Sequence, residues 1–324
     1  MISETAVKIR SMEIRGAGRI ARSAAAALRE YAVEMEASDL LVFVSGMERA
    51  AEMLLETRPT AVSLPNAIHT VMAPLTLAKD VEDARERITK AANEFIRDSE
   101  QAVDRIAAIG ARHIREGDTV LTHCNSEAAL GCILEAARSG KEFEVIATEV
   151  RPRNQGLLTL RVLNDAGVRT NYIVDSAVRS FMNDVDLVVV GADAVTVNGA
   201  VVNKIGTSQI ALAAHEARTP FMVAAETYKF APRTILGELI AIEERDSAEV
   251  LSRELQAELP LVWVRNPAFD VTPAEYVDLI VTEKGAIPPQ MAYIIIRDYL
   301  GWGLEEFTRE SGAAGVNRSE QHDA

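Results

Sequence analysis

From residue 118 onward, short apolar runs alternate with helical segments, and this alternation constrains the fold more than any other feature of the sequence. The apolar runs lie at 118–124, 143–150, 168–175, 185–195, 220–227, 261–266 and 277–284. Amphipathic segments separate several of them, at 126–140, 156–168 and 207–220, and some of these end near a glycine that suits a helix C-cap. Strands joined by helices are typical of a doubly wound sheet. We therefore predict an α/β chain with a Rossmann-like, mostly parallel sheet.

The first 113 residues have a different period. Apolar residues recur three and four positions apart at 19–35, 46–58 and 81–114, as on one face of a helix. The last 16 residues, 309–324, are small and polar. The pattern predicts a helical N-terminal domain over 1–113, a Rossmann-like catalytic domain over 114–308, and a flexible tail over 309–324.

Composition narrows the class of protein. Hydrophobic residues make up 48% and charged residues 25% of the 324, as in a soluble globular enzyme. There is no apolar run of the roughly 18 residues needed to span a bilayer, and the N-terminus lacks the apolar stretch of a secretory signal. A net charge of -14 disfavours nucleic acid and anionic membranes as partners. We expect a cytoplasmic protein that acts on a small molecule.

The chain has two cysteines, Cys124 and Cys132, no CxxC motif and no histidine cluster, so we expect neither a disulfide framework nor a metal site. Cys132 lies within a predicted helix and is interpreted as structural. Cys124 lies where a strand gives way to a helix, just before Ser126, a suitable N-cap. The helix dipole would favour a reactive thiolate there. The alternative is a small buried apolar residue. His123 should point to the opposite face of the strand, which disfavours a Cys-His dyad.

Asp193 follows the apolar run LVVVGA. A carboxyl group among apolar and small residues is desolvated, which raises its pKa and suits a general acid. The alternative is an ordinary aspartate in a turn or helix cap.

Basic and glycine-containing loops also gather at the predicted carboxyl ends of strands, where doubly wound sheets bind ligands. RGAG at 15–18 precedes a helix whose N-terminus could hold a phosphate. Arg58 precedes a proline, and Arg151, Arg153 and Gln155 follow one predicted strand. Asn203, Lys204 and Lys229 lie in other strand-to-helix loops. Each charge alone could be an ordinary solvated loop residue, but their convergence predicts an anionic ligand.

Taken together, these motifs resemble the superfamily of sugar-phosphate isomerases and initiation-factor regulatory subunits. The motifs follow the same order over almost the whole chain: RGAG, TRPTAV, THCNS, E-x-R-P-x-x-Q-G (EVRPRNQG at 149–156), VGADAV, NGAVVNKIGT, AAETYKF and NPAFDVTPAEYVDLIVTEKGAIPP. Methylthioribose-1-phosphate isomerases typically have RGAP in the first loop and lack ETYKF. The non-catalytic initiation-factor subunits have usually lost the cysteine and the aspartate. This sequence keeps both residues and is most similar to the archaeal ribose-1,5-bisphosphate isomerases.

The resemblance implies an intramolecular oxidoreductase that interconverts an aldose and a ketose bisphosphate in nucleoside monophosphate breakdown, with Cys124 as base and Asp193 as acid. It implies a substrate site made of Arg15, Gly16, Ala17, Gly18, Arg58, Gln155, Asn203, Lys204 and Lys229. It also implies no metal or redox cofactor, activation by adenosine monophosphate (AMP), and homo-oligomers of dimers, possibly a trimer of dimers. The alternatives are a methylthioribose-1-phosphate isomerase and a regulatory nucleotide-binding subunit.

Overall fold

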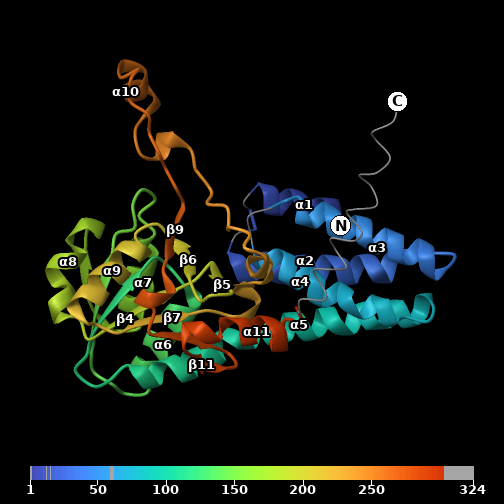
Figure 1. Cartoon of the computed structure of the whole chain (residues 1–324), viewed down its shortest axis with the longest axis horizontal. Coiled ribbons are helices and arrows are strands. Elements are labelled where there is room, and N and C mark those ends of the chain that lie inside the picture. The colour runs from blue at the N-terminus through green and yellow to red at the C-terminus, as the bar shows by residue number, and fades with distance from the viewer. Residues whose placement is uncertain (1, 12, 15, 59–61, 303–324) are drawn as a thin grey trace.

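The computed structural model describes residues 2–11, 13–14, 16–58 and 62–302. A helical part and an α/β part lie side by side, and an arm projects from the α/β part (Figure 1). The predicted tail, 309–324, lies outside the described residues. Within the described residues, no helix is both long and apolar enough to cross a membrane.

The helical part confirms the period of three and four residues. Asp39 and Asp80 each accept a backbone N–H bond three residues on and so cap α3 and α5. Alanines on the inner face of α2 leave room for close packing against its neighbours. The helices are α1 (Ile2–Arg10), α2 (Ala17–Glu34), α3 (Leu40–Leu55), α4 (Ser63–Met72) and α5 (Val81–Gly110), with short 3-10 turns η1 (Ala73–Leu77) and η2 (Ala111–His113).

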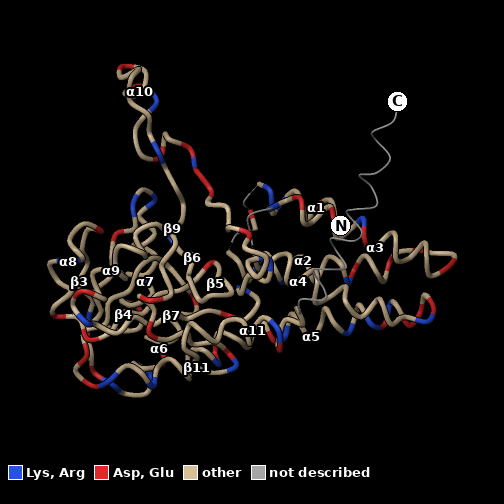
Figure 2. Tube along the Cα trace, viewed as in Figure 1, with Lys and Arg blue, Asp and Glu red and all other residues tan. Residues whose placement is uncertain are grey.

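Helix α5 contributes to both parts of the molecule. Its Ile88 belongs to the core of the helical part, whereas Ile106 packs in a core beneath the sheet. Charged residues of both signs are interspersed along its outer face (Figure 2). The chain then enters the sheet at Thr119. A domain boundary near residue 113 remains a prediction.

The α/β part contains the predicted doubly wound sheet. Its seven strands are ordered β11-β10-β7-β4-β1-β2-β3, and all neighbours pair in parallel except β10 and β11. The strands are β1 (Thr119–His123), β2 (Glu144–Thr148), β3 (Arg169–Ile173), β4 (Leu187–Gly191), β7 (Phe221–Ala224), β10 (Leu279–Thr282) and β11 (Gly285–Ile287).

The order of the strands creates a switch point. From β1 the chain adds β2 and β3 on one side, then returns to place β4, β7 and β10 on the other. The connections therefore diverge between β1 and β4, and a crevice at the carboxyl ends of such strands is where doubly wound sheets bind ligands.

Helices cover both faces of the sheet. The core on one face includes residues of α8 (Val178–Phe181), α9 (Thr207–Ala217) and α11 (Ala292–Tyr299). The core on the other face includes residues of α5, α6 (Glu127–Arg138) and α7 (Gly156–Asp165). The predicted helices at 126–140, 156–168 and 207–220 are thus confirmed.

A second sheet of four short strands, in the order β8-β5-β6-β9, stands next to the first. Sequence periodicity did not predict it, because its strands have only two to four residues. They are β5 (Ala194–Thr196), β6 (Val201–Lys204), β8 (Phe230–Ala231) and β9 (Phe269–Thr272).

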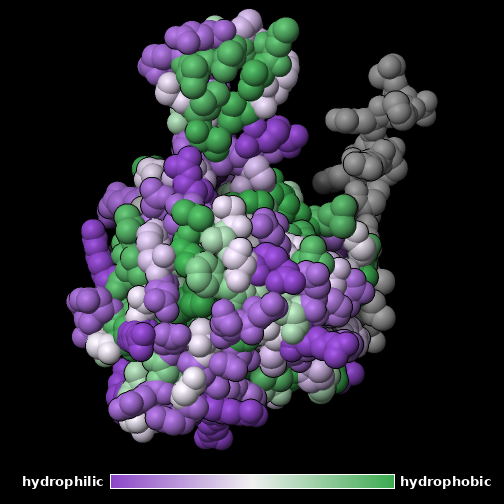
Figure 3. All heavy atoms as spheres, turned by 90° about the vertical axis from the view of Figure 1, so that its left-hand side faces the viewer, coloured by the Kyte–Doolittle hydropathy of each residue, from purple (hydrophilic) through white to green (hydrophobic). Residues whose placement is uncertain are grey.

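One predicted strand is wrong. The apolar run at 261–266 lies outside both sheets, on the arm formed by residues 237–267, which also contains α10 (Arg253–Glu258). Leu261 is 91% and Trp263 88% exposed. Apolar side chains of the arm are visible on its surface in Figure 3. Apolar content predicted burial here, but the fold of a single chain supplies no facing layer.

Candidate active site

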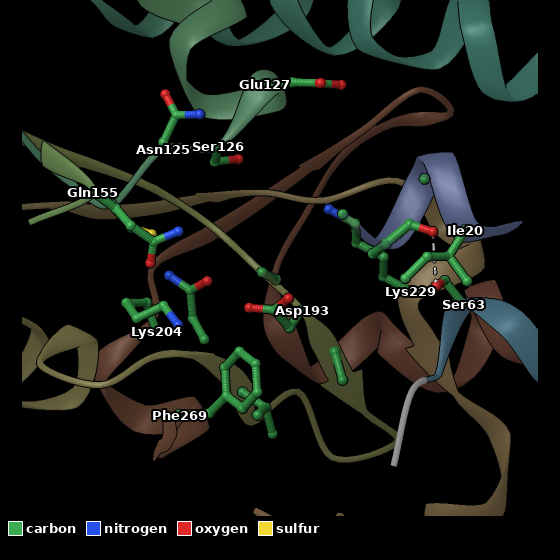
Figure 4. Close-up of a pocket in the computed structure, with 18 of the residues that line it drawn as sticks. Ile20, Ser63, Asn125, Ser126, Glu127, Gln155, Asp193, Lys204, Lys229 and Phe269 are labelled. Atoms are coloured by element: carbon green, nitrogen blue, oxygen red, sulfur yellow. Dashed lines mark hydrogen bonds between the residues drawn. The ribbon is translucent and has the colours of Figure 1, made fainter. Parts of the chain in front are cut away.

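One cavity of about 750 Å³ brings the predicted site residues together. Its lining comes from both parts of the molecule and from the arm (Figure 4). Every residue of the predicted acid-base pair and substrate site that the structure describes lines it; Arg15 lies outside the described residues, and Arg151, predicted to converge on the same ligand, is absent from this lining. These lining residues are Gly16, Ala17, Gly18, Arg58, Cys124, Gln155, Asp193, Asn203, Lys204 and Lys229. Their roles remain predictions.

The two candidate acid-base residues flank the switch point. Cys124 comes directly after β1, and Asp193 comes two residues after β4, which pairs with β1. The Asp193 backbone N–H donates to the Val202 carbonyl at 2.9 Å, which ties this loop to β6. Cys124 has a left-handed backbone with φ of 69°. Such a conformation is uncommon for a non-glycine residue and is often found at functional sites.

Burial of Cys124 works against the thiolate that the helix N-terminus was expected to favour. Ser126 does cap α6, accepting from the Ala129 N–H at 3.3 Å, so the helix N-terminus lies where it was predicted. Burial nevertheless raises the pKa of the Cys124 thiol to about 11, although the Lys204 charge acts in the opposite direction. The thiol lies 3.8 Å from Gln155 Oε1, to which it donates. Desolvation of the charged form therefore has a larger effect on this pKa than the lysine charge.

Asp193 has the environment that was predicted for a general acid. Burial raises the pKa of its carboxyl group, against the charges of Lys229, Lys204 and other cations of the cavity. Figure 4 shows Asp193 between these two lysines. A raised pKa keeps the carboxyl group protonated at a higher pH than usual, as proton donation requires.

The two lysines differ in how their charge is held. Lys229 Nζ lies 2.7 Å from Glu226 Oε2, and both side chains are buried. Lys204 Nζ donates to the Ala268 carbonyl at 3.2 Å and lies 4.7 Å from the centroid of the Phe269 ring. Both ammonium groups reach a cavity suited to an anion.

Two glycines shape the loops of the site in different ways, one through its backbone conformation and one through a close backbone contact. Gly16, with φ of 90°, precedes the first turn of α2, which opens onto the cavity. A Cβ on Gly156 would lie 2.0 Å from the Thr148 carbonyl oxygen, so only glycine lets α7 begin directly behind Gln155. The loop carrying Gln155 is thereby held close to Cys124.

His123 is absent from the cavity lining and makes structural contacts. It ends β1, whereas Cys124 lies beyond the strand in a left-handed conformation, so the predicted separation of the two side chains does not arise from strand alternation. Its Nε2 lies 2.9 Å from the Ile205 carbonyl and its Nδ1 lies 2.6 Å from Thr148 Oγ1. Nε2–H therefore donates to the carbonyl, and the threonine hydroxyl donates to Nδ1. Burial lowers the pKa of the imidazole, which favours this neutral ring.

Sequence analysis missed several charged residues of the cavity. Arg245 comes from the arm, where no motif or periodicity marked it, and Glu226 was quoted within AAETYKF without being assigned a role. Arg19 directly follows Gly18, and Arg161 lies six residues after Gln155 in α7, so their closeness to predicted site residues could have identified them. Among the described residues, no group of His, Cys, Asp and Glu is arranged to hold a metal ion.

Comparison with known proteins identifies the family to which this chain belongs. The model of the initiation factor 2 subunit family matches residues 13–289. The chain belongs to this family. It is 58% identical to ribose 1,5-bisphosphate isomerase of Archaeoglobus fulgidus over 94% of this chain and 96% of the relative. The corresponding protein of Methanocaldococcus jannaschii is 54% identical over 93% and 96%.

The fold is similarly matched among members of this family with solved structures. The translation initiation factor eIF-2B of Pyrococcus horikoshii is 34% identical, with a TM-score of 0.74 over 89% of this chain and 97% of that one. A helical N-terminal part next to a mostly parallel sheet is therefore the architecture of the family.

Proposed function

We propose that this protein is a sugar-phosphate isomerase that converts ribose 1,5-bisphosphate to ribulose 1,5-bisphosphate. The observation that carries the proposal is the placement of a thiol and a protonatable carboxyl group at the switch point, in a cavity lined by cations. The similarity to ribose 1,5-bisphosphate isomerases over nearly the whole chain supports the same substrate.

The substrate itself explains why both an acid and a base are needed. The phosphate on C1 prevents the ring from opening to a free aldehyde. Asp193 donates a proton to the ring oxygen as the bond between C1 and the ring oxygen breaks. Cys124 takes the proton from C2, and a C1–C2 double bond forms. The resulting enol phosphate receives a proton at C1 and loses one from the C2 hydroxyl, which leaves the ketone. The proton count balances with no redox partner.

The cations oppose the charge of the two phosphates. The cavity is lined by Arg58, Lys204 and Lys229. The first turn of α2 also lines it, and the free backbone N–H groups of a helix N-terminus suit an anion. The Cys124 thiol is a weaker acid than the sequence predicted, because burial raises its pKa. Lys204 therefore has a second role. Its charge lowers the pKa of Cys124 against burial and so favours the thiolate that removes the C2 proton.

The decisive experiment is turnover. Purified protein with ribose 1,5-bisphosphate should yield ribulose 1,5-bisphosphate, followed by ³¹P and ¹³C NMR. Methylthioribose 1-phosphate is the matched control, because an apolar group replaces its second phosphate. Turnover of the methylthio sugar alone would reassign the substrate. Nucleotide binding without turnover of either sugar would favour a regulatory subunit.

Further properties belong to the same proposal. The protein works in the cytoplasm in nucleoside monophosphate breakdown, as a homo-oligomer of dimers, possibly a trimer of dimers. AMP activates it, and it requires no metal or redox cofactor. Light scattering with and without AMP tests the assembly, and assays after dialysis against a chelator test the independence from metal.

A further inference from the structure

The two chain segments at the base of the arm pair with each other. The Arg245 N–H donates to the Asn266 carbonyl at 2.9 Å, and the Ala268 N–H donates to the Glu243 carbonyl at 2.8 Å. Glu244 and Pro267 form an antiparallel bridge between these contacts. Glu243 and Arg245 are two residues apart on this extended segment, so their side chains point to the same face. On that face, Arg245 lines the cavity.

One carboxylate joins two arginines from different parts of the molecule. Glu243 Oε2 lies 3.2 Å from an Nη of Arg58, in the helical part, and Oε1 lies 3.4 Å from Nε of Arg245, in the arm. The arginine side chains are only 17% and 14% exposed. Both line the cavity, and the contact of Arg245 with Glu243 is made through Nε, one part of a guanidinium that has five N–H donors.

Arg245 is also close enough to act on the acid-base pair. Its charge is among those that lower the pKa of Cys124 and of Asp193 against the larger effect of burial. Arg58 acts likewise on Asp193. Both guanidinium groups line the same cavity as Cys124 and Asp193, where an anionic substituent of a bound sugar can meet them.

We propose that Arg245 is a substrate-binding residue and that Glu243 is the positioning residue that aligns it with Arg58. The two arginines bind one phosphate of the sugar bisphosphate between the arm and the helical part. Arginine forks match phosphate oxygens in a way that a lysine point charge does not. This inference rests on the proposed function and adds to it a determinant of specificity for the bisphosphate.

The test compares four variants with the wild type: Arg245→Ala, Arg245→Lys, Glu243→Gln and Arg265→Ala. Arg265 is the matched control because it lies on the same arm, pairs with Glu244, and is 79% exposed. The measurements are kcat and KM for ribose 1,5-bisphosphate and, by calorimetry, Kd for ribulose 1,5-bisphosphate. Thermal melting checks that each variant is folded.

We expect Arg245→Ala to raise KM and Kd about 30-fold while kcat falls less than about fivefold, as for the loss of a charge-assisted binding contact. Arg245→Lys should raise KM about fivefold, and this variant decides the question if Arg245→Ala does not fold. Glu243→Gln should raise KM about fivefold at unchanged kcat, a split that general loosening of the fold would not produce. Arg265→Ala should match the wild type.

Two results would overturn the inference in different ways. Wild-type protein that neither binds nor converts the bisphosphate would remove the proposed function and this inference with it. Active wild type together with folded Arg245 variants whose KM and Kd stay within about threefold of its values would reject the arginine clamp alone.

Discussion

A buried lysine lies on each of two sides of the cavity, and the surroundings shift the pKa values of the two lysines in opposite directions. On the Cys124 side, burial lowers the pKa of Lys204, which has a carbonyl and an aromatic ring as neighbours. On the Asp193 side, burial alone would lower the pKa of Lys229, but the charge of Glu226 at 2.7 Å reverses this and raises it. Both lysines are 8% exposed.

The difference teaches which charge is available to a ligand. The Lys229 charge is already balanced by a buried carboxylate, so that pair forms a fixed part of the site. The nearest neighbours of Lys204 stabilise its charge only partly, so an incoming phosphate would gain more from it. The Cys124 side should therefore respond to substrate, and the Asp193 side should hold its shape.

The largest expected effect removes the reacting group from either side. Cys124→Ser and Asp193→Asn should each lower kcat about 10³-fold, the usual contribution of a positioned acid or base, with bisphosphate affinity within about threefold of the wild type. Steady-state kinetics and calorimetry measure both. Cys132→Ala, at the buried cysteine of α6, is the control and should keep turnover. Wild-type rates in both site variants would remove the acid-base assignment.

The fixed pair on the Asp193 side predicts a large loss of stability. Glu226→Gln leaves the buried Lys229 without its partner charge, and should lower the free energy of unfolding by about 3 kcal/mol. On the other side, Lys204→Met removes a buried charge for which the described residues provide no carboxylate at salt-bridge distance. It should change the free energy of unfolding by less than about 1 kcal/mol. Urea unfolding measures both. Equal losses in the two variants would contradict the comparison.

The raised pKa of Cys124 predicts a steep pH dependence of its reactivity. With the pKa at about 11, the thiolate fraction, and with it the rate of alkylation by iodoacetamide, should rise about tenfold per pH unit from pH 7 to 10. Mass spectrometry of the labelled peptide measures the rate in ligand-free protein, with Cys124→Ser as the control. A plateau already near neutral pH would restore the thiolate that the helix dipole suggested.

The smallest expected effect concerns binding on the Cys124 side. Lys204→Ala should raise KM for the bisphosphate about tenfold and lower kcat less than about threefold, because a phosphate contact acts in both the ground and the transition state. Initial-rate measurements separate the two constants. A loss confined to kcat at saturating substrate would instead assign Lys204 mainly to the activation of the thiol.

Much of the site was visible in the sequence. The rule that ligands collect at the carboxyl ends of parallel strands placed Cys124, Gln155 and Asp193 on one edge of the sheet, and all three line one cavity. Lys204, predicted in a strand-to-helix loop, lines the same cavity from the end of β6 in the second sheet. Arg245 could not be found in this way. It belongs to no repeating pattern, and it reaches the cavity only because the arm pairs with itself at its base. The apolar run at 261–266 was predicted to be a strand because periodicity alone cannot distinguish an exposed arm from a strand.

The sequence by itself determined the two parts of the chain, the doubly wound sheet and the cap at Ser126, because apolar period and local hydrogen bonding are written in neighbouring residues. Only the tertiary structure decided that β4 pairs with β1, which sets Asp193 beside Cys124. It also decided the burial of the thiol. Burial depends on every layer packed around a group, and here desolvation raises the pKa of Cys124, against the thiolate that the local helix terminus would favour.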